Sequence, residues 1–385
     1  MKMLAVKRTL GVVVACAALC AAQSANANLI TNGGFEADPA GTSASGTDFV
    51  DVSTITDWRA FAVGGATAAF TVEAAAANSG LVGVQLSRDA GGADSALDRD
   101  AHRIAISTQP RVYKQLVDVR DGGAHGGATN FVLNTQFFSG GSFSGNIRAQ
   151  GIDPQAGWET TGLTASSAAG EDQLALRYSV DQLQSAYLDN VDLVDATLGV
   201  NRMINGGFEN SATRVLDYRF VSVAGGAGSV ALDPDAASGS AAALLTRTDA
   251  AGDSVLDLDP FRIATLGGET LRVDFASKKV TGAADSRIRT SLAMFNSGGA
   301  HLGDLTPGLF DPSTSSYSTF STEYTLLPGT AFVNLGFRVF NAAGAASTGS
   351  YLLDDISVVG VPEPTSILLM GFASLGLLSL RRRSA

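Results

Sequence analysis

The most regularly spaced acidic residues are two Asp-x-Asp pairs, Asp98 with Asp100 and Asp257 with Asp259. In an extended strand such residues point to the same face, so each pair presents two carboxylates that could bind a cation. Neither pair is followed by the glycine and glutamate of an EF-hand loop. The alternative is salt bridges to arginines at matching positions in the sequence, namely Arg88, Arg103, Arg247 and Arg262. Of the two interpretations we favour the salt bridges.

A second available chemistry is stacking of sugar rings on aromatic side chains, because sugar C–H faces pack on Trp and Tyr rings. Trp58 and Tyr218 follow an aspartate and precede an arginine in two related tripeptides, and we expect both in a core. Trp158 follows Gly157 in a loop rich in Asp, Pro and Gly, where exposure is expected. The candidate ligand-binding residues are therefore Trp158, Tyr113, Tyr317 and Tyr324.

The sequence offers little material for catalysis, and we expect no enzyme. Its three histidines, His102, His125 and His301, have no HExxH spacing. No Gly-x-Ser-x-Gly elbow occurs. A glycoside hydrolase stays open as a less favoured alternative, because the distance between two carboxylates cannot be read from a sequence.

The N-terminal residues are typical of a secretory signal peptide. A basic start and an apolar run over residues 10–22 precede the small residues Ala25 and Ala27, which predicts cleavage after Ala27. The apolar run is too short for a membrane span of roughly 20 residues. Both cysteines, Cys16 and Cys20, lie inside this segment. The mature chain therefore has no disulfide, and its stability must come from a core or from bound ions.

At the C-terminus, Pro362, Glu363 and Pro364 precede an apolar run over residues 367–380 and the cluster Arg381, Arg382 and Arg383. These three features, in this order, resemble the PEP-CTERM sorting signal. The resemblance implies a Gram-negative cell, export through the inner membrane and processing by an exosortase near the triplet. The short apolar run suits a transient transmembrane helix, and the arginines favour a cytoplasmic end. An ordinary C-terminal membrane anchor is the alternative.

Charge limits the partners of the segment between these two ends. Residues 28–360 hold 20 basic and 36 acidic residues, a net charge of −16. This balance argues against nucleic-acid binding, which needs a basic surface. It favours the attraction of divalent cations.

An internal repeat organises the same segment. Asn-Gly-Gly-Phe-Glu at residues 32–36 recurs at 205–209, and residues 86–105 align without gaps on 245–264. The period far exceeds the roughly 20–50 residues of a solenoid unit. We therefore predict two domains, residues 28–197 and 198–360. The join between them is short, so we expect the domains to touch.

Within each repeat, apolar and polar residues alternate with a period of two. Residues 174–180 and 333–339 show this pattern, and Gly-, Ser- and Asn-rich breaks separate such runs. The alternation is typical of antiparallel strands that bury one face, and such strands stack as two sheets. The predicted fold class is all-β, with two tandem antiparallel β-sandwiches, and the resemblance described next implies the jelly-roll type.

The ends of both repeats resemble the galactose-binding-like jelly rolls, which include many carbohydrate-binding modules. The resemblance rests on the opening Asn-Gly-Gly-Phe-Glu and on the closing segments at residues 187–191 and 352–356. It implies that the first and last strands lie together. It also implies a structural Ca²⁺ near the opening glutamate and the closing aspartate, which nominates Glu36 with Asp189 and Glu209 with Asp354. The first repeat departs from the pattern with Asn190 where the second has Asp355.

These observations predict an exported, exosortase-processed protein of the cell surface or extracellular matrix. Its expected partners are signal peptidase, exosortase, the inner membrane in transit and an extracellular polysaccharide bound without catalysis. The alternative is a purely structural surface protein with no glycan ligand.

Overall fold

The computed structural model describes residues 28–47, 49, 55–90, 94–123, 130–180, 184–211, 214–223, 226–249, 253–258 and 262–362. The predicted signal peptide, including Ala25 and Ala27, lies outside these residues, as do Glu363, Pro364, Arg381, Arg382 and Arg383 of the sorting segment. In the described part, the only helical pieces are two short 3-10 turns, η1 (Ala74–Ala76) and η2 (Asp100–His102). No helix among the described residues is long and apolar enough to cross a membrane.

The strands up to Asp195 form two sheets. Sheet A has the order β1 (Ser43–Thr47), β3 (Thr67–Glu73), β4 (Gly83–Ala90), β12 (Gln184–Asp195), β7 (Val112–Asp121) and β10 (Glu159–Ser166). Sheet B has the order β2 (Arg59–Val63), β5 (Asp94–Asp98), β11 (Gln173–Val180), β8 (Phe131–Ser139) and β9 (Ser142–Ile152), and β6 (Ile104–Ala105) also pairs with β11.

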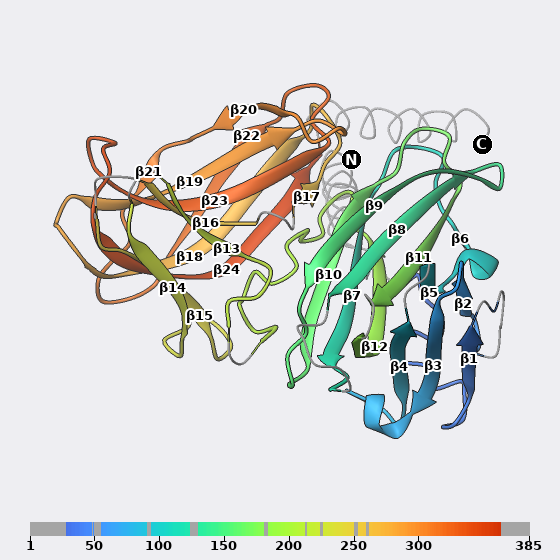
Figure 1. Ribbon diagram of the computed structural model, residues 1–385. Coiled ribbons are helices and arrows are strands. Elements are labelled where there is room, and N and C mark those ends of the chain that lie inside the picture. Colours follow the sequence, from blue (N-terminus) through green and yellow to red (C-terminus); the bar gives the residue numbers. More distant parts are fainter. Residues whose placement is uncertain are drawn as a thin grey trace, which may run out of the picture.

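The strands from Arg219 onward form two further sheets. Sheet C has the order β13 (Arg219–Val223), β16 (Asp253–Asp257), β23 (Phe332–Asn341), β19 (Ser286–Phe295) and β20 (His301–Leu305), with β17 (Ile263–Ala264) on β23 and β21 (Leu309–Phe310) on β19. Sheet D has the order β14 (Gly228–Asp233), β15 (Ala242–Arg247), β24 (Gly349–Val361), β18 (Thr270–Gly282) and β22 (Ser318–Thr325). Among the described strands, no ladder joins A or B to C or D (Figure 1).

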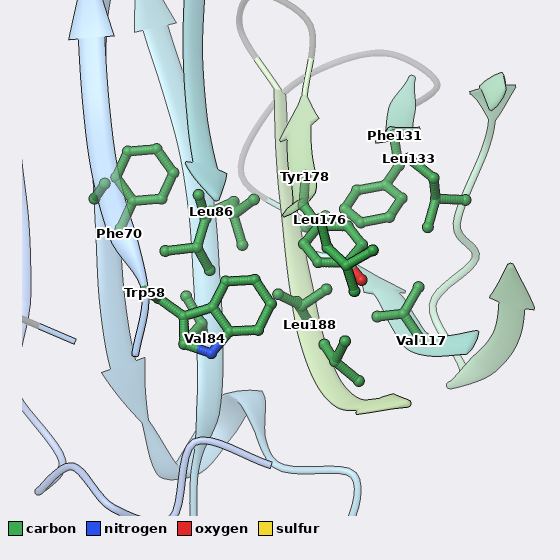
Figure 2. Close-up of a cluster of buried hydrophobic side chains, with 14 of the residues drawn as sticks. Trp58, Phe70, Val84, Leu86, Val117, Phe131, Leu133, Leu176, Tyr178 and Leu188 are labelled. Carbon is green, nitrogen blue, oxygen red and sulfur yellow. The ribbon is translucent and has the colours of Figure 1, made fainter. Parts of the chain in front are cut away.

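Each pair of sheets stacks on one apolar core. Between sheets A and B, the inward residues of β11, such as Leu176 and Tyr178, meet Leu86 and Leu188 of sheet A (Figure 2). The Trp58 indole is fully buried there, with its ring centroid 5.8 Å from that of Tyr178. Burial raises the pKa of Tyr178, whose hydroxyl donates to Gln115 Oε1 at 3.1 Å. The predicted all-β sandwich fold is confirmed.

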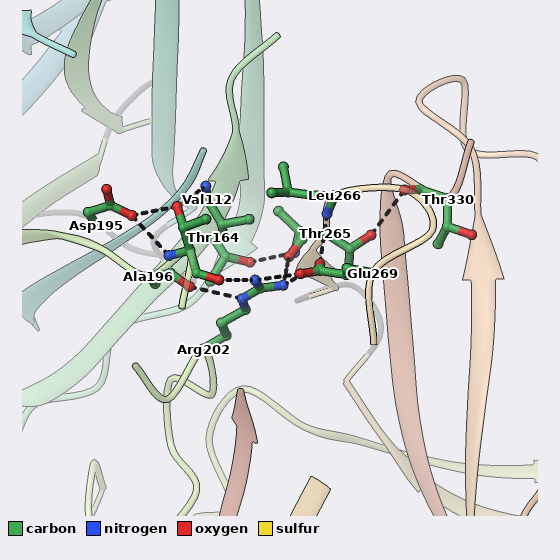
Figure 3. Close-up of polar contacts among 11 residues, drawn as sticks. Val112, Thr164, Asp195, Ala196, Arg202, Thr265, Leu266, Glu269 and Thr330 are labelled. Carbon is green, nitrogen blue, oxygen red and sulfur yellow. Dashed lines mark hydrogen bonds and ion pairs between the residues drawn. The ribbon is translucent and has the colours of Figure 1, made fainter. Parts of the chain in front are cut away.

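The two pairs of sheets touch through an interface centred on Arg202 (Figure 3). Its guanidinium is fully buried and makes a bidentate ion pair with Glu269, at 2.6 and 2.9 Å. It also donates to the carbonyls of Ala196 and Thr197, at 3.0 and 2.7 Å. Arg202 therefore ties the join between the halves to the start of β18. Such a charge is stable when buried because every donor direction is paired.

A second polar cluster lies where β10 meets the chain before β13. Glu159 is buried and accepts from Arg214 at 2.7 and 3.0 Å and from Ser211 at 2.8 Å. Next to it, Asp217 is only 3% exposed and accepts from the Thr161 hydroxyl at 3.0 Å. The other oxygen of Asp217 is buried and makes no hydrogen bond. Burial, with a further contribution from Glu159, raises the pKa of Asp217 to about 7.

This raised pKa predicts how pH affects stability. Because the folded-state pKa lies above the ordinary value, the folded chain holds a proton that the unfolded chain releases between about pH 4 and 7. The free energy of unfolding therefore falls as pH rises through this window. We expect Asp217→Asn, which keeps an acceptor for Thr161, to raise the melting temperature relative to wild type more at pH 8 than at pH 4.

Asp57→Asn is the matched control for this measurement. Asp57 and Asp217 have nearly the same backbone φ, 66° and 67°, but the side chain of Asp57 is 30% exposed. Its effect on the melting temperature, measured at pH 4 and pH 8, is the baseline for that of Asp217→Asn. A pH-independent effect of Asp217→Asn would refute the assignment of this titration to Asp217.

Candidate functional site

The opening glutamate and closing aspartate of the first half lie side by side and bind one loop. Asp189 Oδ2 accepts from the backbone N–H groups of Asn78 and Ser79, at 2.8 and 3.0 Å. Glu36 Oε1 accepts from those of Leu81 and Val82, at 2.8 and 3.1 Å. Together the two carboxylates hold the turn between η1 and β4.

The second half contains the same arrangement. Asp354 Oδ2 accepts from Ala237 N and Ser238 N, at 2.7 and 3.1 Å. Glu209 Oε1 accepts from Ser240 N and Ala241 N, at 2.7 and 2.8 Å.

A glycine in each of the two loops makes these contacts possible. Gly80 and Gly239 both have φ of +67°, and a Cβ there would lie 2.1 and 2.3 Å from the Oε1 atom of Glu36 and Glu209. We call the four acids Glu36, Asp189, Glu209 and Asp354 the loop anchors.

The loop anchors are the residues nominated for calcium, and their geometry bears on that prediction. Calcium takes about six to eight oxygen ligands, whereas Asp189 Oδ2 and Glu36 Oε1 each accept two backbone N–H groups. Among the residues that the structure describes, no group of three or more His, Cys, Asp or Glu side chains could hold a metal ion. The arrangement fits loop anchoring better than metal coordination, and calcium at these positions remains a prediction.

The two roles can be separated by one variant. Asp354→Ala leaves three backbone N–H groups without their acceptor, including that of Asp355 at 2.7 Å. We expect a loss of about 1–3 kcal/mol in the free energy of unfolding, equal in EDTA and in Ca²⁺. Thermal unfolding of wild type and variant measures it. A wild-type melting temperature that rises with Ca²⁺, and does so only when Asp354 is present, would instead establish the calcium site.

The four aromatic candidates have different surroundings. Tyr113 and Tyr324 are 3% and 2% exposed and belong to the two cores, so neither ring has a free face for a sugar. Burial raises the pKa of both hydroxyls to about 12. Their inward positions on β7 and β22 argue against the ligand-binding role nominated for these two residues.

Trp158 and Tyr317 are half-buried. The Arg120 guanidinium lies 5.0 Å from the Trp158 ring centroid, a cation–π contact. The Tyr317 hydroxyl donates to the Asp235 carbonyl, and burial raises its pKa. The structure brings neither ring next to the other candidates of its half.

The first Asp-x-Asp pair is a salt-bridge site. Asp98 makes a bidentate pair with Arg59, at 2.8 and 2.9 Å, and Asp100 binds Arg103 at 2.6 Å. Burial raises the pKa of Asp98 against the lowering effect of Arg59. The preference for salt bridges holds, with Arg59 rather than Arg88 as the partner of Asp98. Arg219 pairs with Asp257 at 3.4 Å in the second half, while Asp259 lies outside the described residues.

The outer face of sheet B carries a row of polar residues that sequence reasoning missed. The strand registers place Arg59 opposite Asp98, Asp98 opposite Arg177, Arg177 opposite Asn134 and Asn134 opposite Arg148. The row therefore crosses five strands with one residue on each. We call these five residues the sheet B row: Arg59, Asp98, Arg177, Asn134 and Arg148.

Part of this row lines a recess of about 130 Å³ over β8, β9 and β11. The Asn146 amide donates to Asn134 Oδ1 at 3.1 Å, and the Arg177 guanidinium lies 4.7 Å from the Phe61 ring centroid. The lining residues are Val132, Asn134, Asn146, Arg148, Arg177 and Ser179. The alternation over residues 174–180 was a usable signal, because Leu176 and Tyr178 face the core and so turn Arg177 and Ser179 outward.

The corresponding row of sheet C has small residues where sheet B has Arg177 and Asn134. Arg219 lies opposite Asp257, Asp257 opposite Gly336 and Gly336 opposite Ser291. A Cβ on Gly336 would lie 2.9 Å from Val255 Cγ1 and 3.1 Å from Ser291 Oγ. A side chain at this position would therefore require Val255 or Ser291 to move.

A comparison with protein-family models identifies the PEP-CTERM protein-sorting motif at residues 360–383. The motif implies export and membrane-anchored processing in a Gram-negative cell. It begins at Gly360, inside β24, and Pro362, the first residue of the triplet, is exposed. No curated protein matches the chain.

Solved structures similar to this chain include carbohydrate-binding modules. The tandem CBM22-1–CBM22-2 domains of Paenibacillus barcinonensis Xyn10C match at 13% identity and a TM-score of 0.33, over 84% of this chain and 99% of that one. TmCBM61 in complex with β-1,4-galactotriose matches at 15% identity and a TM-score of 0.29, over 42% and 100%. The enzymatically active domain of a bacteriophage CBA120 tailspike matches at 12% identity and a TM-score of 0.34, over 42% of this chain and only 22% of its own length.

Proposed function

We propose that this exported protein binds polysaccharide without catalysis, at the recess on the outer face of sheet B. The observation that carries the proposal is the recess itself, about 130 Å³ in volume and lined on three adjacent strands by amide, hydroxyl and guanidinium groups. Such groups read sugar hydroxyls by directional hydrogen bonds. They sit on rigid strands, so their spacing is fixed before a ligand arrives.

The amide pair at the centre of the recess provides donors and acceptors together. The bond between Asn146 Nδ2 and Asn134 Oδ1 uses one donor and one acceptor of the pair. The pair also carries the Asn134 amide nitrogen and the Asn146 carbonyl oxygen, a donor and an acceptor. A sugar hydroxyl needs both kinds of partner, since it donates and accepts. The recess therefore suits a chain of hydroxyls.

The proposal on location follows from the sorting motif. We propose that signal peptidase cleaves the chain after Ala27. The apolar C-terminal segment then holds the chain in the inner membrane during export, and exosortase processes it near Pro362. The body, as two units over residues 28–197 and 198–360, then reaches the cell surface or the extracellular matrix. Polysaccharide is abundant in both places, which makes it an accessible ligand for the recess.

The absence of catalysis is part of the proposal. Glycoside hydrolysis by the common route needs two carboxyl groups that flank the bond to be cleaved. No carboxylate is among the residues that line the recess. The nearest acid of the sheet B row, Asp98, is 1% exposed and engaged by Arg59. These features favour binding over bond cleavage.

The alternative is a structural protein without a glycan ligand, and the contact between the halves is the observation that supports it. The hydrogen bonds from Arg202 to the carbonyls of Ala196 and Thr197, and the bond of 2.7 Å from Ala264 N to Thr164 Oγ1, hold one half against the other. Two halves joined in this way suit a spacer. Under this alternative the protein would retain no polysaccharide at all.

The recess predicts the effect of a double substitution. We expect Asn134→Ala with Asn146→Ala to weaken polysaccharide binding by about tenfold, because loss of these amide contacts removes about 1.4 kcal/mol. Affinity electrophoresis against a panel of secreted and insoluble polysaccharides measures it.

Trp158→Ala and Tyr317→Ala test the aromatic sites in the same assay. We expect both variants to bind like wild type, since neither side chain lines the recess. Weakened binding by Trp158→Ala alone would move the site to Trp158. Retention of no polysaccharide by wild type would favour the structural alternative.

A further inference from the structure

We infer that the recess on sheet B is built for an acidic polysaccharide, with Arg148 and Arg177 as the groups that receive its carboxylates. This inference rests on the proposed function and names its ligand class. It comes from the distribution of charge over the outer face of sheet B, which differs from the charge of the rest of the chain.

The sheet B row is positive in an otherwise acidic protein. Residues 28–360 carry a net charge of −16. The row contains three arginines, Arg59, Arg177 and Arg148, and one acid, Asp98, so its own net charge is +2. The lining of the recess holds two arginines and no acid. A neutral glycan would not require this local reversal of charge, whereas an anionic one would be repelled without it.

Arginine is the side chain best suited to this task. Its planar guanidinium binds a carboxylate with two parallel N–H···O bonds and stays charged at all accessible pH values. Within the recess the remaining lining groups are amides, a hydroxyl and Val132, with no aromatic ring. The chemistry of the lining therefore matches carboxylates and hydroxyls, and it lacks the stacking platform typical of neutral sugar sites.

The structure also orients Arg177. Its guanidinium lies over the Phe61 ring at 4.7 Å, and Arg59 lies over the same ring at 5.3 Å. Asp98, which Arg59 holds with two hydrogen bonds, lies opposite Arg177 in the register. Arg177 is thus held between an aromatic face and the centre of the row. A side chain already ordered in this way loses little rotamer freedom when a ligand binds.

Arg148 lies at the other end of the recess. Arg177 and Arg148 both pair with Asn134, from opposite sides, so their backbones are about 10 Å apart at the usual strand spacing. Arg148 is exposed on β9. The two arginines therefore flank the amide pair Asn134 and Asn146. A chain that lies across the strands would place carboxylates at both ends and hydroxyls over the amides between them.

The second half supplies an internal comparison. At the positions that match Arg177 and Asn134, sheet C has Gly336 and Ser291, and its row is neutral with one arginine and one aspartate. Sheet C also has outward arginines, because Arg338 lies opposite Arg289 two residues beyond Gly336. At the position of Arg177 itself, however, the second half has a glycine, so Arg177 is not a residue that the shared fold requires.

The test compares one polymer with and without its carboxylates. The full exported protein is titrated with polygalacturonate and with the same polymer after reduction of its carboxyl groups, by isothermal calorimetry in EDTA. EDTA removes divalent ions that could bridge an acidic polymer to an acidic protein. Neutral xylan and galactan are included as further ligands. We expect polygalacturonate to bind at least tenfold more tightly than its carboxyl-reduced form.

Two substitutions locate the effect. Arg148→Gln is expected to weaken polygalacturonate binding by about tenfold and to weaken binding of the reduced polymer by a much smaller factor. Arg272→Gln is the matched control, because Arg272 is a 49% exposed arginine on sheet D that pairs with Asp274 at 2.9 Å. We expect it to change neither affinity. Thermal unfolding of both variants checks that they fold.

The outcomes separate the inference from the proposed function. Equal binding of native and reduced polymer, or preference for xylan or galactan, overturns the inference and leaves polysaccharide binding in place. Binding of polygalacturonate that Arg148→Gln does not alter also overturns it, because the carboxylates would then bind elsewhere. Binding of no polymer overturns the proposed function and the inference together.

Discussion

The constraint on which the rest of the structure depends is the two-residue period of its strands. In β11 the side chains of Leu176 and Tyr178 must reach the core between sheets A and B, where both are fully buried. The pleat then turns Arg177 and Ser179 outward. Because β8 and β9 obey the same rule, Asn134 and Arg148 join Arg177 in one row. The recess thus follows from core packing, because burial of the inward apolar residues leaves their polar neighbours on the outer face.

The loop anchors show how a chain without disulfides fixes its turns. Asp189 Oδ2 and Asp354 Oδ2 each accept two backbone N–H groups of a loop that leads into an interior strand, β4 or β15, and backbone N–H groups need such partners away from water. Desolvation raises the pKa of Asp189 and Asp354, and the N–H donors lower it again in part. Carboxylates that accept hydrogen bonds from backbone amides in this way fix a loop as a disulfide or a bound ion does in other proteins.

The contact between the halves contains two buried charged groups, Arg202 with all of its hydrogen bonds formed and Asp217 with one oxygen that forms none. Arg202 is buried with all of its directions paired, so it fixes the orientation of the join. Asp217, a short distance along the same chain, has one buried oxygen without a hydrogen bond, and its pKa rises to about 7. The interface is therefore stable as a whole while it retains one group that responds to pH near neutrality.

Several features were determined by the sequence alone. Alternation over residues 174–180 and 333–339 predicted the antiparallel sandwiches, since a period of two can bury only one face of a strand. The Pro-Glu-Pro triplet with its apolar run and arginines predicted the sorting signal, because that signal is a linear pattern. The pairing of Glu36 with Asp189 and of Glu209 with Asp354 came from the resemblance at the ends of the repeats.

The tertiary structure decided what those residues do. It placed Tyr113 and Tyr324 in the cores, gave Asp98 the partner Arg59, and aligned Arg177, Asn134 and Arg148 in one row. These outcomes depend on strand order and register, which here join residues 14 to 43 positions apart in sequence. Alternation tells which face a side chain occupies but not which strand lies next to it, and so the recess became visible only when the sheets were assembled.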